Sequence, residues 1–377
     1  MGSSKIPVLW VTGAPGAGKS TSGWGLFTRI SGRGGSVAYV DIDQLGLIGP
    51  PPGGGDASHE IKAANLLRVI ALLRRRGVQQ VIVSGVVDPK LGVEPFFAGS
   101  AEAGHIDLTL VRLRCDREEL RRRFLGRGSP AGLLTELFEL VDKLDRTAIG
   151  ALLDTTGQHL DDTVDALMEH CVVRRGPVQP LVPVEDAMPP RPVIVVVGAT
   201  AVGKSTAAWS VLRDLWQSGV PTAYIDLDQL GFVHPGPDHL LQAANLAALW
   251  RGYRQAGAQA LLLVTREPGA AVLGALAEEL LAVVRLDADA ATLEDRIRRR
   301  ADGESALLAG DELRGAPLEV QSRVAARAVA EADRLRSSGA YRMVLDTTGQ
   351  SPQETSAALL DMLSPALESL LPEPDPR

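Results

Sequence analysis

The chain has few aromatic residues, few cysteines and no excess of basic charge. Aromatic residues make up 4% of its 377 residues, so aliphatic side chains must fill most of the core. Cys115 and Cys171 lie far apart and form no CxxC or Cys/His spacing, so the cysteine pattern indicates no metal site and fits a reducing compartment. The net charge of −7 argues against a nucleic-acid partner, because proteins that bind a phosphate backbone usually carry a basic face.

Long apolar runs are also missing. The run Pro192–Gly198 has the length of a buried strand, whereas a membrane helix needs ~20 apolar residues. The N-terminus has no charged stretch leading into an apolar signal region, and Ile6 stands where a myristoylation motif needs Ser or Thr. We therefore expect a cytoplasmic protein with no membrane partner; its oligomeric state stays open.

The most informative feature is that the second half of the sequence repeats the first. The segment VTGAPGAGKST begins at Val11, and the segment VVGATAVGKST begins at Val196. The further matches, in the same order in both halves, pair Ala38–Gly46 with Ala223–Gly231, Ala63–Leu66 with Ala243–Leu246, Arg123 and Arg127 with Arg296 and Arg300, and Leu153–Gln158 with Leu345–Gln350. This order indicates a tandem duplication in which loops have changed length.

A proline-rich stretch separates the repeats. Proline lacks the backbone N–H and fixes φ, so residues 174–191 cannot continue a helix or a sheet. We expect one domain in residues 1–173, a semi-stiff extended linker in 174–191 and a second domain in 192–377, each folding on its own.

Each half alternates apolar, β-branched segments with amphipathic ones. This pattern predicts an α/β fold in which a parallel sheet is covered by helices on both faces. In the first half we expect strands at Pro7–Thr12, Ser36–Asp41, Gln80–Ser84, Leu108–Leu113 and Leu152–Asp154. The expected helices are Lys19–Ser31, Ile61–Arg76, Arg117–Leu125, Ala131–Arg146 and Leu160–His170.

Both halves contain the pattern G-x-x-x-x-G-K-S between an apolar strand and a helix, at Gly13–Ser20 and Gly198–Ser205. Glycines let backbone N–H groups turn inward around a phosphate, the lysine reaches the β and γ oxygens, and the serine hydroxyl is a ligand of Mg²⁺. The helix N-terminus favours an anion there. The predicted nucleotide-binding residues are Gly13, Gly16, Gly18, Lys19, Ser20 and Thr21 in the first half, and Gly198, Gly203, Lys204, Ser205 and Thr206 in the second.

A pair of aspartates follows the second strand of each half, Asp41 and Asp43 in the first and Asp226 and Asp228 in the second. Residues i and i+2 of a strand point to one face, so both carboxylates are expected in the crevice at the strand's C-terminal end. We predict that Asp41 and Asp226, with Ser20 and Ser205, order the Mg²⁺ shell. Asp43 and Asp228 would orient and deprotonate an acceptor hydroxyl. The alternative is a turn-forming or capping role.

The phosphate motif followed by Asp-x-Asp-Gln-Leu-Gly resembles the small-molecule kinase branch of P-loop proteins, which includes adenylylsulfate, shikimate and gluconate kinases. Adenylylsulfate kinases carry Asp-Gly-Asp-Asn at the equivalent place; here Ile42 or Leu227 replaces the glycine, and Gln44 or Gln229 the asparagine. The resemblance covers essentially each whole half. It implies two five-stranded parallel sheets in the order 2-3-1-4-5, ATP and Mg²⁺ as cofactors, an acceptor pocket beside the second strand, and a mobile lid.

Arg123 and Arg127 are four residues apart, as are Arg296 and Arg300, so each pair lies on one helix face. The resemblance implies that these are lid arginines that neutralise the transferred phosphoryl group. A solvated basic face is the alternative. Asp-Thr-Thr-Gly strings place Thr155 and Thr347 either beside the nucleotide base or in a turn that caps a helix, and the sequence favours neither.

The third strands end differently in the two halves, with Ser84-Gly85 in the first and Thr265-Arg266 in the second. We therefore expect different acceptor sites, in which Arg266 either binds an anionic acceptor or pairs with Glu267. Neither strand ends in the acidic residue that mechanical ATPases use for Mg²⁺, which favours a kinase. His59 and His239 match each other before a helix, where they cap the helix, lie on the surface or contact a substrate.

The sequence thus predicts an ATP-dependent kinase that phosphorylates a hydroxyl of a small molecule. Two alternatives stay open: a nucleoside or nucleotide kinase, and an ATP-binding regulatory module with one half catalytically silent. The identity of the acceptor, the choice between ATP and GTP, and the packing of the halves are not determined by these motifs.

Overall fold

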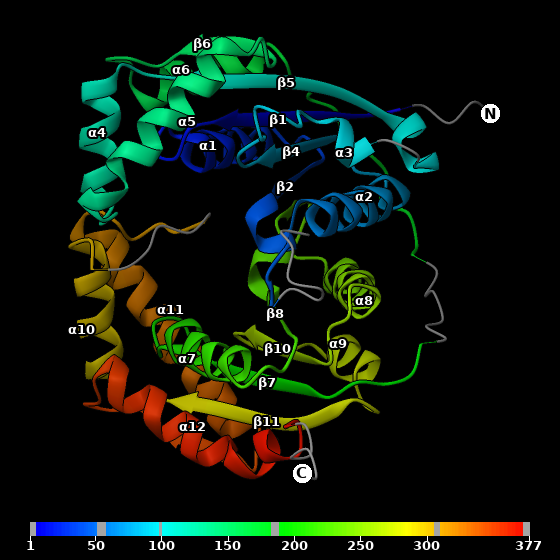
Figure 1. The fold of residues 1–377 in the computed structure, drawn as a ribbon. Coiled ribbons are helices and arrows are strands. Elements are labelled where there is room, and N and C mark those ends of the chain that lie inside the picture. The colour runs from blue at the N-terminus through cyan, green and yellow to red at the C-terminus, as the bar shows by residue number, and fades with distance from the viewer. Residues whose placement is uncertain (1–4, 51–57, 98–99, 182–187, 305–309, 372–377) are drawn as a thin grey trace, which may run out of the picture.

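The structure is a computed structural model, described for residues 5–50, 58–97, 100–181, 188–304 and 310–371. It contains two sheets, which lie one above the other in Figure 1 with helices around and between them. The strands of the first half are β1 (Ile6–Gly13), β2 (Val37–Asp41), β3 (Ile48–Gly49), β4 (Gln80–Ser84), β5 (Ile106–Arg114) and β6 (Ala151–Asp154). Its helices are α1 (Lys19–Gly32), α2 (Ser58–Arg76), α3 (Glu94–Phe97), α4 (Arg117–Gly126), α5 (Leu134–Arg146) and α6 (Leu160–Met168), with 3₁₀ turns η1 (Ile42–Leu45), η3 (Ala101–His105) and η4 (Ala131–Leu133).

The second half repeats this layout. Its strands are β7 (Val193–Gly198), β8 (Thr222–Asp226), β9 (Val233–His234), β10 (Ala260–Thr265), β11 (Leu280–Asp287) and β12 (Met343–Asp346). Its helices are α7 (Lys204–Gln217), α8 (His239–Gln255), α9 (Ala270–Ala275), α10 (Ala290–Ala301), α11 (Leu318–Ser337) and α12 (Pro352–Glu368), with the 3₁₀ turn η5 (Leu227–Leu230).

The strand order confirms the predicted fold. The sheets run β6-β5-β1-β4-β2-β9 and β12-β11-β7-β10-β8-β3. Five strands of each sheet come from a single half of the chain. Numbered in chain order, these five strands follow the order 2-3-1-4-5 in both sheets, and they are all parallel. Every residue of β7 and β10 is buried, as expected for strands that helices cover on both faces.

Each sheet has a sixth strand that the sequence did not predict, because it comes from the other half. β9 pairs antiparallel with β2, with Val37 opposite His234, and β3 pairs with β8, with Ile48 opposite Ala223. A further backbone hydrogen bond extends the pairing of β2 with β9, from Tyr39 N to the oxygen of Phe232 (2.9 Å). Strands of two residues carry no periodic pattern, so only the folded chain reveals them.

The two halves also share an apolar core. Helices α2 and α8 lie side by side between the sheets (Figure 1), and buried residues of both halves form one cluster that includes Leu66 and Ile70 of α2 with Leu246 and Leu249 of α8. The α2–α8 contact is close at Gly252, where an added Cβ would stand 2.1 Å from Oδ1 of Asn65. The two halves therefore pack against each other, an arrangement that the sequence motifs did not determine.

The first part of the linker lies along the first half. Ser36 N donates to the oxygen of Arg174 (2.7 Å), and Gln179 N donates to the oxygen of Arg76 (2.9 Å). Its described residues contain no helix or strand, as the prolines predict. Among the helices of the described residues, none is long and apolar enough to cross a bilayer.

Candidate nucleotide and acceptor sites

The two phosphate loops have the same backbone conformation. Gly18 and Gly203 precede α1 and α7 with φ of 99° and 101°, and neither helix has a side-chain cap in the described structure. The N–H groups of the first turn are therefore available to an anion. Gly16 adopts φ of 91°, and the matching residue of the second loop, Ala201, keeps a left-handed φ of 66°. The second loop thus retains this shape although a left-handed alanine costs ~1–2 kcal/mol.

The loop lysines are buried against their own loops. Lys19 Nζ donates to the oxygen of Ala14 (3.0 Å), and Lys204 Nζ donates to the oxygen of Ala199 (2.9 Å). Burial lowers the pKa of Lys19 to about 8, against the opposing effect of the nearby Asp43 carboxylate, and burial likewise lowers the pKa of Lys204. A bound phosphate would compensate the buried charge, so this environment suits an anionic ligand.

Asp41 and Asp226 both cap the turn that follows their strand. Asp43 N donates to Oδ1 of Asp41 (3.0 Å), and Asp228 N donates to Oδ1 of Asp226 (3.1 Å). Burial, with the second aspartate beside it, raises the pKa of Asp41 to about 6, and that of Asp226 to about 6. The capping role is therefore present, and it leaves Oδ2 of each residue for another partner.

In the second half that other oxygen faces the loop serine, since Ser205 Oγ donates to Oδ2 of Asp226 (3.5 Å). The described residues contain no cluster of three or more His, Cys, Asp or Glu side chains that could hold a metal. One serine and one carboxylate would suit Mg²⁺ if phosphate oxygens and water supplied the other ligands, as is usual for this ion. The residues therefore fit a Mg–nucleotide better than a resident metal.

Asp43 and Asp228 have different partners. Oδ1 of Asp43 pairs with Lys62 Nζ of α2 at 2.8 Å, and its side chain is 60% exposed. Asp228 instead pairs with Arg266 Nε at 3.1 Å and also accepts from Arg266 N (3.2 Å). Arg266 therefore pairs with Asp228, whereas Glu267 lies near Arg334. Asp43 and Asp228 therefore have different surroundings in the two halves.

Glu331 of α11 was missed by sequence reasoning. Its buried Oε2 accepts hydrogen bonds from Thr200 N and Thr200 Oγ1 of the second phosphate loop, both at 2.8 Å, and Oε1 lies 3.9 Å from Arg266 Nη1. The first loop has Pro15 at the position of Thr200, and proline has no N–H to donate. No local signal marks Glu331, because it is one acidic residue in a long amphipathic helix.

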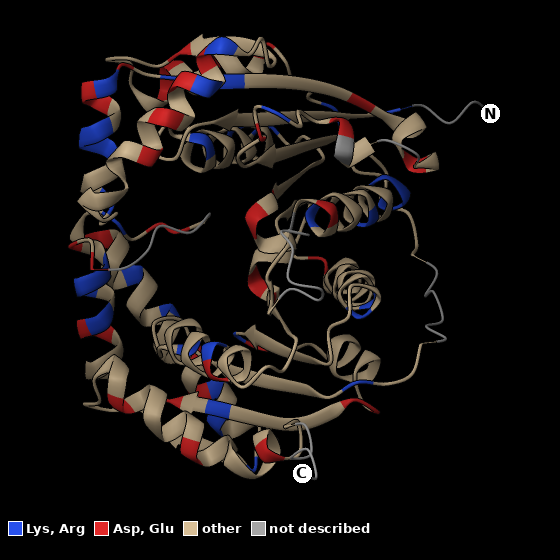
Figure 2. Cartoon of the chain, viewed as in Figure 1, with Lys and Arg blue, Asp and Glu red and all other residues tan. Residues whose placement is uncertain are grey.

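Of the predicted lid arginines, Arg123 lies on α4 and Arg296 and Arg300 lie on α10, and Figure 2 shows basic residues along both helices. Arg127 follows the last residue of α4 as its C-cap. Arg123 Nη2 donates to the oxygen of Thr155 (3.3 Å), and Arg296 Nη2 donates to the oxygen of Thr347 (2.8 Å). The first arginine of each pair therefore joins its helix to the loop after the last strand. The second arginine of each pair has a different partner. Arg127 Nε donates to Ser129 Oγ (2.9 Å), and Arg300 Nε donates to Oδ2 of Asp311 (3.1 Å).

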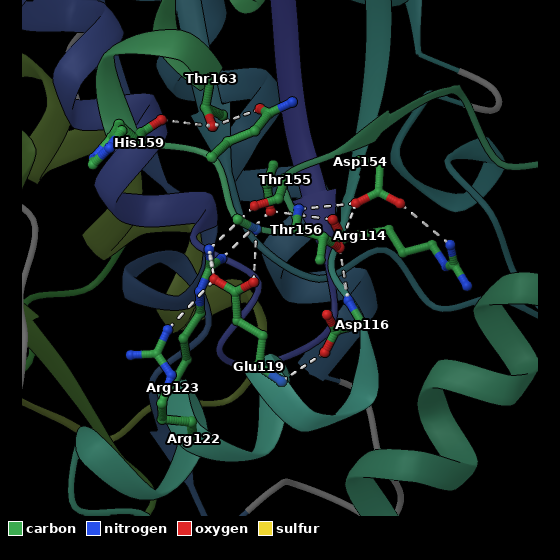
Figure 3. Close-up of polar contacts among 12 residues, drawn as sticks. Arg114, Asp116, Glu119, Arg122, Arg123, Asp154, Thr155, Thr156, His159 and Thr163 are labelled. Carbon is green, nitrogen blue, oxygen red and sulfur yellow. Dashed lines mark hydrogen bonds and ion pairs between the residues drawn. The ribbon is translucent and has the colours of Figure 1, made fainter.

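The Asp-Thr-Thr-Gly strings contact the segments that precede α4 and α10, and Figure 3 shows these contacts in the first half. In the first half Thr156 N donates to Oδ1 of Asp154 (2.9 Å), and Thr156 Oγ1 accepts from Asp116 N (2.9 Å). The second half repeats both contacts through Asp346, Thr348 and Asp289. These contacts favour the interpretation as a turn that caps a helix. The sequence alone favoured neither this interpretation nor base recognition.

Two cavities contain most of the predicted residues. The first-half cavity, of about 980 Å³, is lined by Gly16, Gly18, Lys19, Ser20, Thr21, Arg123, Arg127 and Thr155 among others. The second-half cavity, of about 540 Å³, is lined by Gly203, Lys204, Ser205, Thr206, Asp226, Asp228, Arg296 and Arg300 among others. Gly13, Asp41 and Asp43 do not line the first cavity, and Gly198 and Thr347 do not line the second. Both volumes lie in the usual range of small-molecule pockets, ~300–1,000 Å³.

A family model described as an AAA domain matches residues 9–143. Solved structures similar to one half of the chain include a tunicamycin resistance protein of Deinococcus radiodurans, with 15% identity, a TM-score of 0.36, and coverage of 47% of this chain and 100% of that one. Another is the APS kinase of Mycobacterium tuberculosis in complex with AMPPNP and APS, with 19% identity, a TM-score of 0.30, and coverage of 44% and 98%. The shikimate kinase of Bacteroides thetaiotaomicron has 15% identity, a TM-score of 0.29, and coverage of 44% and 97%. No curated protein matches the chain.

Proposed function

We propose that this chain, a tandem pair of P-loop kinase-like domains, transfers the γ-phosphate of ATP to a hydroxyl of a small molecule. A nucleotide-dependent phosphotransferase is what such a fold supports in general. The observation that carries the finer proposal is the pair of strand-end carboxylates beside a buried loop lysine, since Asp41 and Asp43 both act on the pKa of Lys19. We propose residues 1–173 and 192–377 as the two domains, joined by 174–191.

ATP would be held by the loop amides, Lys19 and Lys204, with Thr21 and Thr206 on the same helix turns. Mg²⁺, when bound with the nucleotide, would neutralise phosphate charge. Ser20 and Asp41, or Ser205 and Asp226, are the residues placed to order it, as the 3.5 Å contact between Ser205 Oγ and Oδ2 of Asp226 illustrates.

Asp43 and Asp228 would act on the acceptor. A carboxylate within hydrogen-bond reach of a hydroxyl can orient it and take its proton. Because phosphoryl transfer passes through a loose transition state, position matters more than basicity. Arg123, Arg127, Arg296 and Arg300 would neutralise the transferred group when the lid helices approach the phosphates.

The second candidate function, with one half regulatory, is favoured by one observation. Asp228 already accepts from Arg266 at two atoms, whereas Asp43 is more exposed and has one lysine partner. An acceptor hydroxyl would have to compete with Arg266 in the second half. We therefore expect the first half to dominate turnover of a given acceptor.

A screen of metabolite hydroxyls for acceptor-dependent ADP release tests the proposal. Turnover should require one acceptor class and should be lost in Lys19→Ala if the first half is the active one. Nucleotide binding without acceptor-dependent turnover across the screen would favour the regulatory function, and turnover with nucleosides or nucleotides would favour a nucleotide kinase.

A further inference from the structure

The nucleotide cavity of the first half is not built from the first half alone. Asp311, Glu312 and Arg314, which precede α11 in the second half, line it together with Lys19 and Arg127. The contribution is one-sided, because every described residue that lines the second cavity belongs to the second half. A second-half segment therefore forms part of the wall of the first site.

This segment, Gly310–Arg314, is anchored at several points. Asp311, whose side chain is 2% exposed, accepts from Arg300 Nε (3.1 Å), and its Oδ1 accepts from Leu313 N (3.0 Å). Leu313 is buried in the core of the second half. Gly310 adopts φ of 79°, and a Cβ there would lie 3.3 Å from the ring of Trp24 of α1. The segment therefore passes close to α1 of the first half, while Asp311 and Leu313 anchor it in the second half.

Arg314 reaches across to the first lid helix. Its Nη2 donates to the oxygen of Gly126, the last residue of α4. Its Nη1 is buried and has no hydrogen-bond partner among the residues that the structure describes. A buried guanidinium nitrogen without a partner carries a desolvation cost that an anion would remove.

We propose that Arg314 of the second half is a nucleotide-binding residue of the first half, where its guanidinium contacts a phosphate oxygen. The inference rests on the proposed function, which places a nucleotide in this cavity. The same cavity wall carries Arg127, so the phosphates would be contacted by arginines from both halves. The tandem arrangement then has a direct role, since the first site is incomplete without the second half.

The test uses the full chain carrying Lys204→Ala, so that the first site is measured alone. In this background Arg314→Gln should weaken the binding of a non-hydrolysable Mg–ATP analogue by about 10-fold or more, the scale of one hydrogen bond to a charged group. Arg314→Lys should restore part of the affinity. Adenosine should bind all three proteins equally, at both sites, because it has no phosphate for Arg314 or Lys204 to contact. A merely structural role at Gly126 would instead weaken adenosine and the triphosphate together.

Arg298→Gln is the matched control, because Arg298 lies on α10, pairs with Asp295 and is 65% exposed. It should bind the analogue as the Lys204→Ala parent does. Equal affinity of Arg314→Gln and its parent for the analogue would overturn the inference and leave the proposed function intact. Absence of analogue binding by the parent would contradict nucleotide binding in the first half, and the inference would fail with it.

Discussion

Asp41 and Asp226 carry carboxyl groups that resist ionisation. Burial raises the pKa of each to about 6, from an ordinary value of 3.8. Their protonation in the folded chain contributes stability that is present below pH ~4 and is lost as the pH rises through ~6. A carboxylate must be ionised to order Mg²⁺. Binding of a metal–nucleotide would therefore require the carboxyl group to lose its proton.

We predict that the affinity for the Mg–ATP analogue rises with pH between ~5 and ~7. The measurement is calorimetry across this range with Lys204→Ala, compared with the same chain carrying Asp41→Asn. The phosphate groups of the nucleotide titrate equally in both, so the difference between the two profiles isolates Asp41. Parallel profiles would mean that Asp41 acts only as the cap of η1.

Asp43→Asn should separate catalysis from binding. The change keeps the size and removes the charge, so turnover in the first half should fall by ~10²-fold, the scale of general-base catalysis. ATP affinity should barely change, because the phosphate loop is untouched. Asp228→Asn serves as the comparison and should have a small effect on a reaction that the first half performs. Near-normal turnover of both variants in steady-state kinetics would make these carboxylates structural.

At the residue scale, the sequence is most informative where the signal is local. The phosphate loop and the Asp-x-Asp turn are short continuous strings, and the loop geometry at Gly18 and Gly203 follows from them. Glu331 and Arg314 were missed because each reaches its neighbours through tertiary packing from a distant segment. The roles of the predicted site residues remain predictions until the variants are measured.

At the scale of elements, the α2–α8 contact depends on a helix residue without a side chain. A methyl group at Gly252 would meet Oδ1 of Asn65 at 2.1 Å, and Asn65 is buried where its Nδ2 donates to the oxygen of Leu45 (2.8 Å). Gly252→Ala should therefore lower the free energy of unfolding by ~1–3 kcal/mol, the usual cost of overpacking.

Gly274→Ala in α9 is the control, because no atom lies within 4 Å of the added Cβ. Both variants replace a helical glycine with alanine, which favours the helix, so a loss of stability in Gly252→Ala alone during urea unfolding reports the contact with Asn65. If Gly252→Ala is as stable as Gly274→Ala, helices α2 and α8 are farther apart in solution than here.

The parallel strands were predictable because their apolar, β-branched runs are continuous. The exchanged strands β3 and β9 were not, since two residues carry no period and their partners lie in the other half. The matched Ala63–Leu66 and Ala243–Leu246 segments were visible in the sequence. Their role in the shared core, through Leu66 and Leu246, became visible only in the fold.

At the scale of the whole molecule, the exchanged strands and the shared core join the two halves. Residues 1–181 alone would leave the edge of β2 unpaired and the buried face of α2 exposed to water. We predict that this fragment and residues 188–377 each melt at a lower temperature than the full chain, and that mixing them restores the higher transition. Calorimetry and gel filtration of the fragments are the measurements. Fragments that melt at the temperature of the full chain and do not associate would show that the interface between the halves does not contribute to stability.

The central claim is that one chain holds two nucleotide sites, which the duplicated loops and the two cavities support. Isothermal titration calorimetry with a non-hydrolysable ATP analogue and Mg²⁺ tests it most directly. The wild-type chain should bind about two analogues, and Lys19→Ala and Lys204→Ala should each bind about one, because each removes the cation that contacts the phosphates. A wild-type stoichiometry of one that one of these substitutions leaves unchanged would contradict the claim for that half.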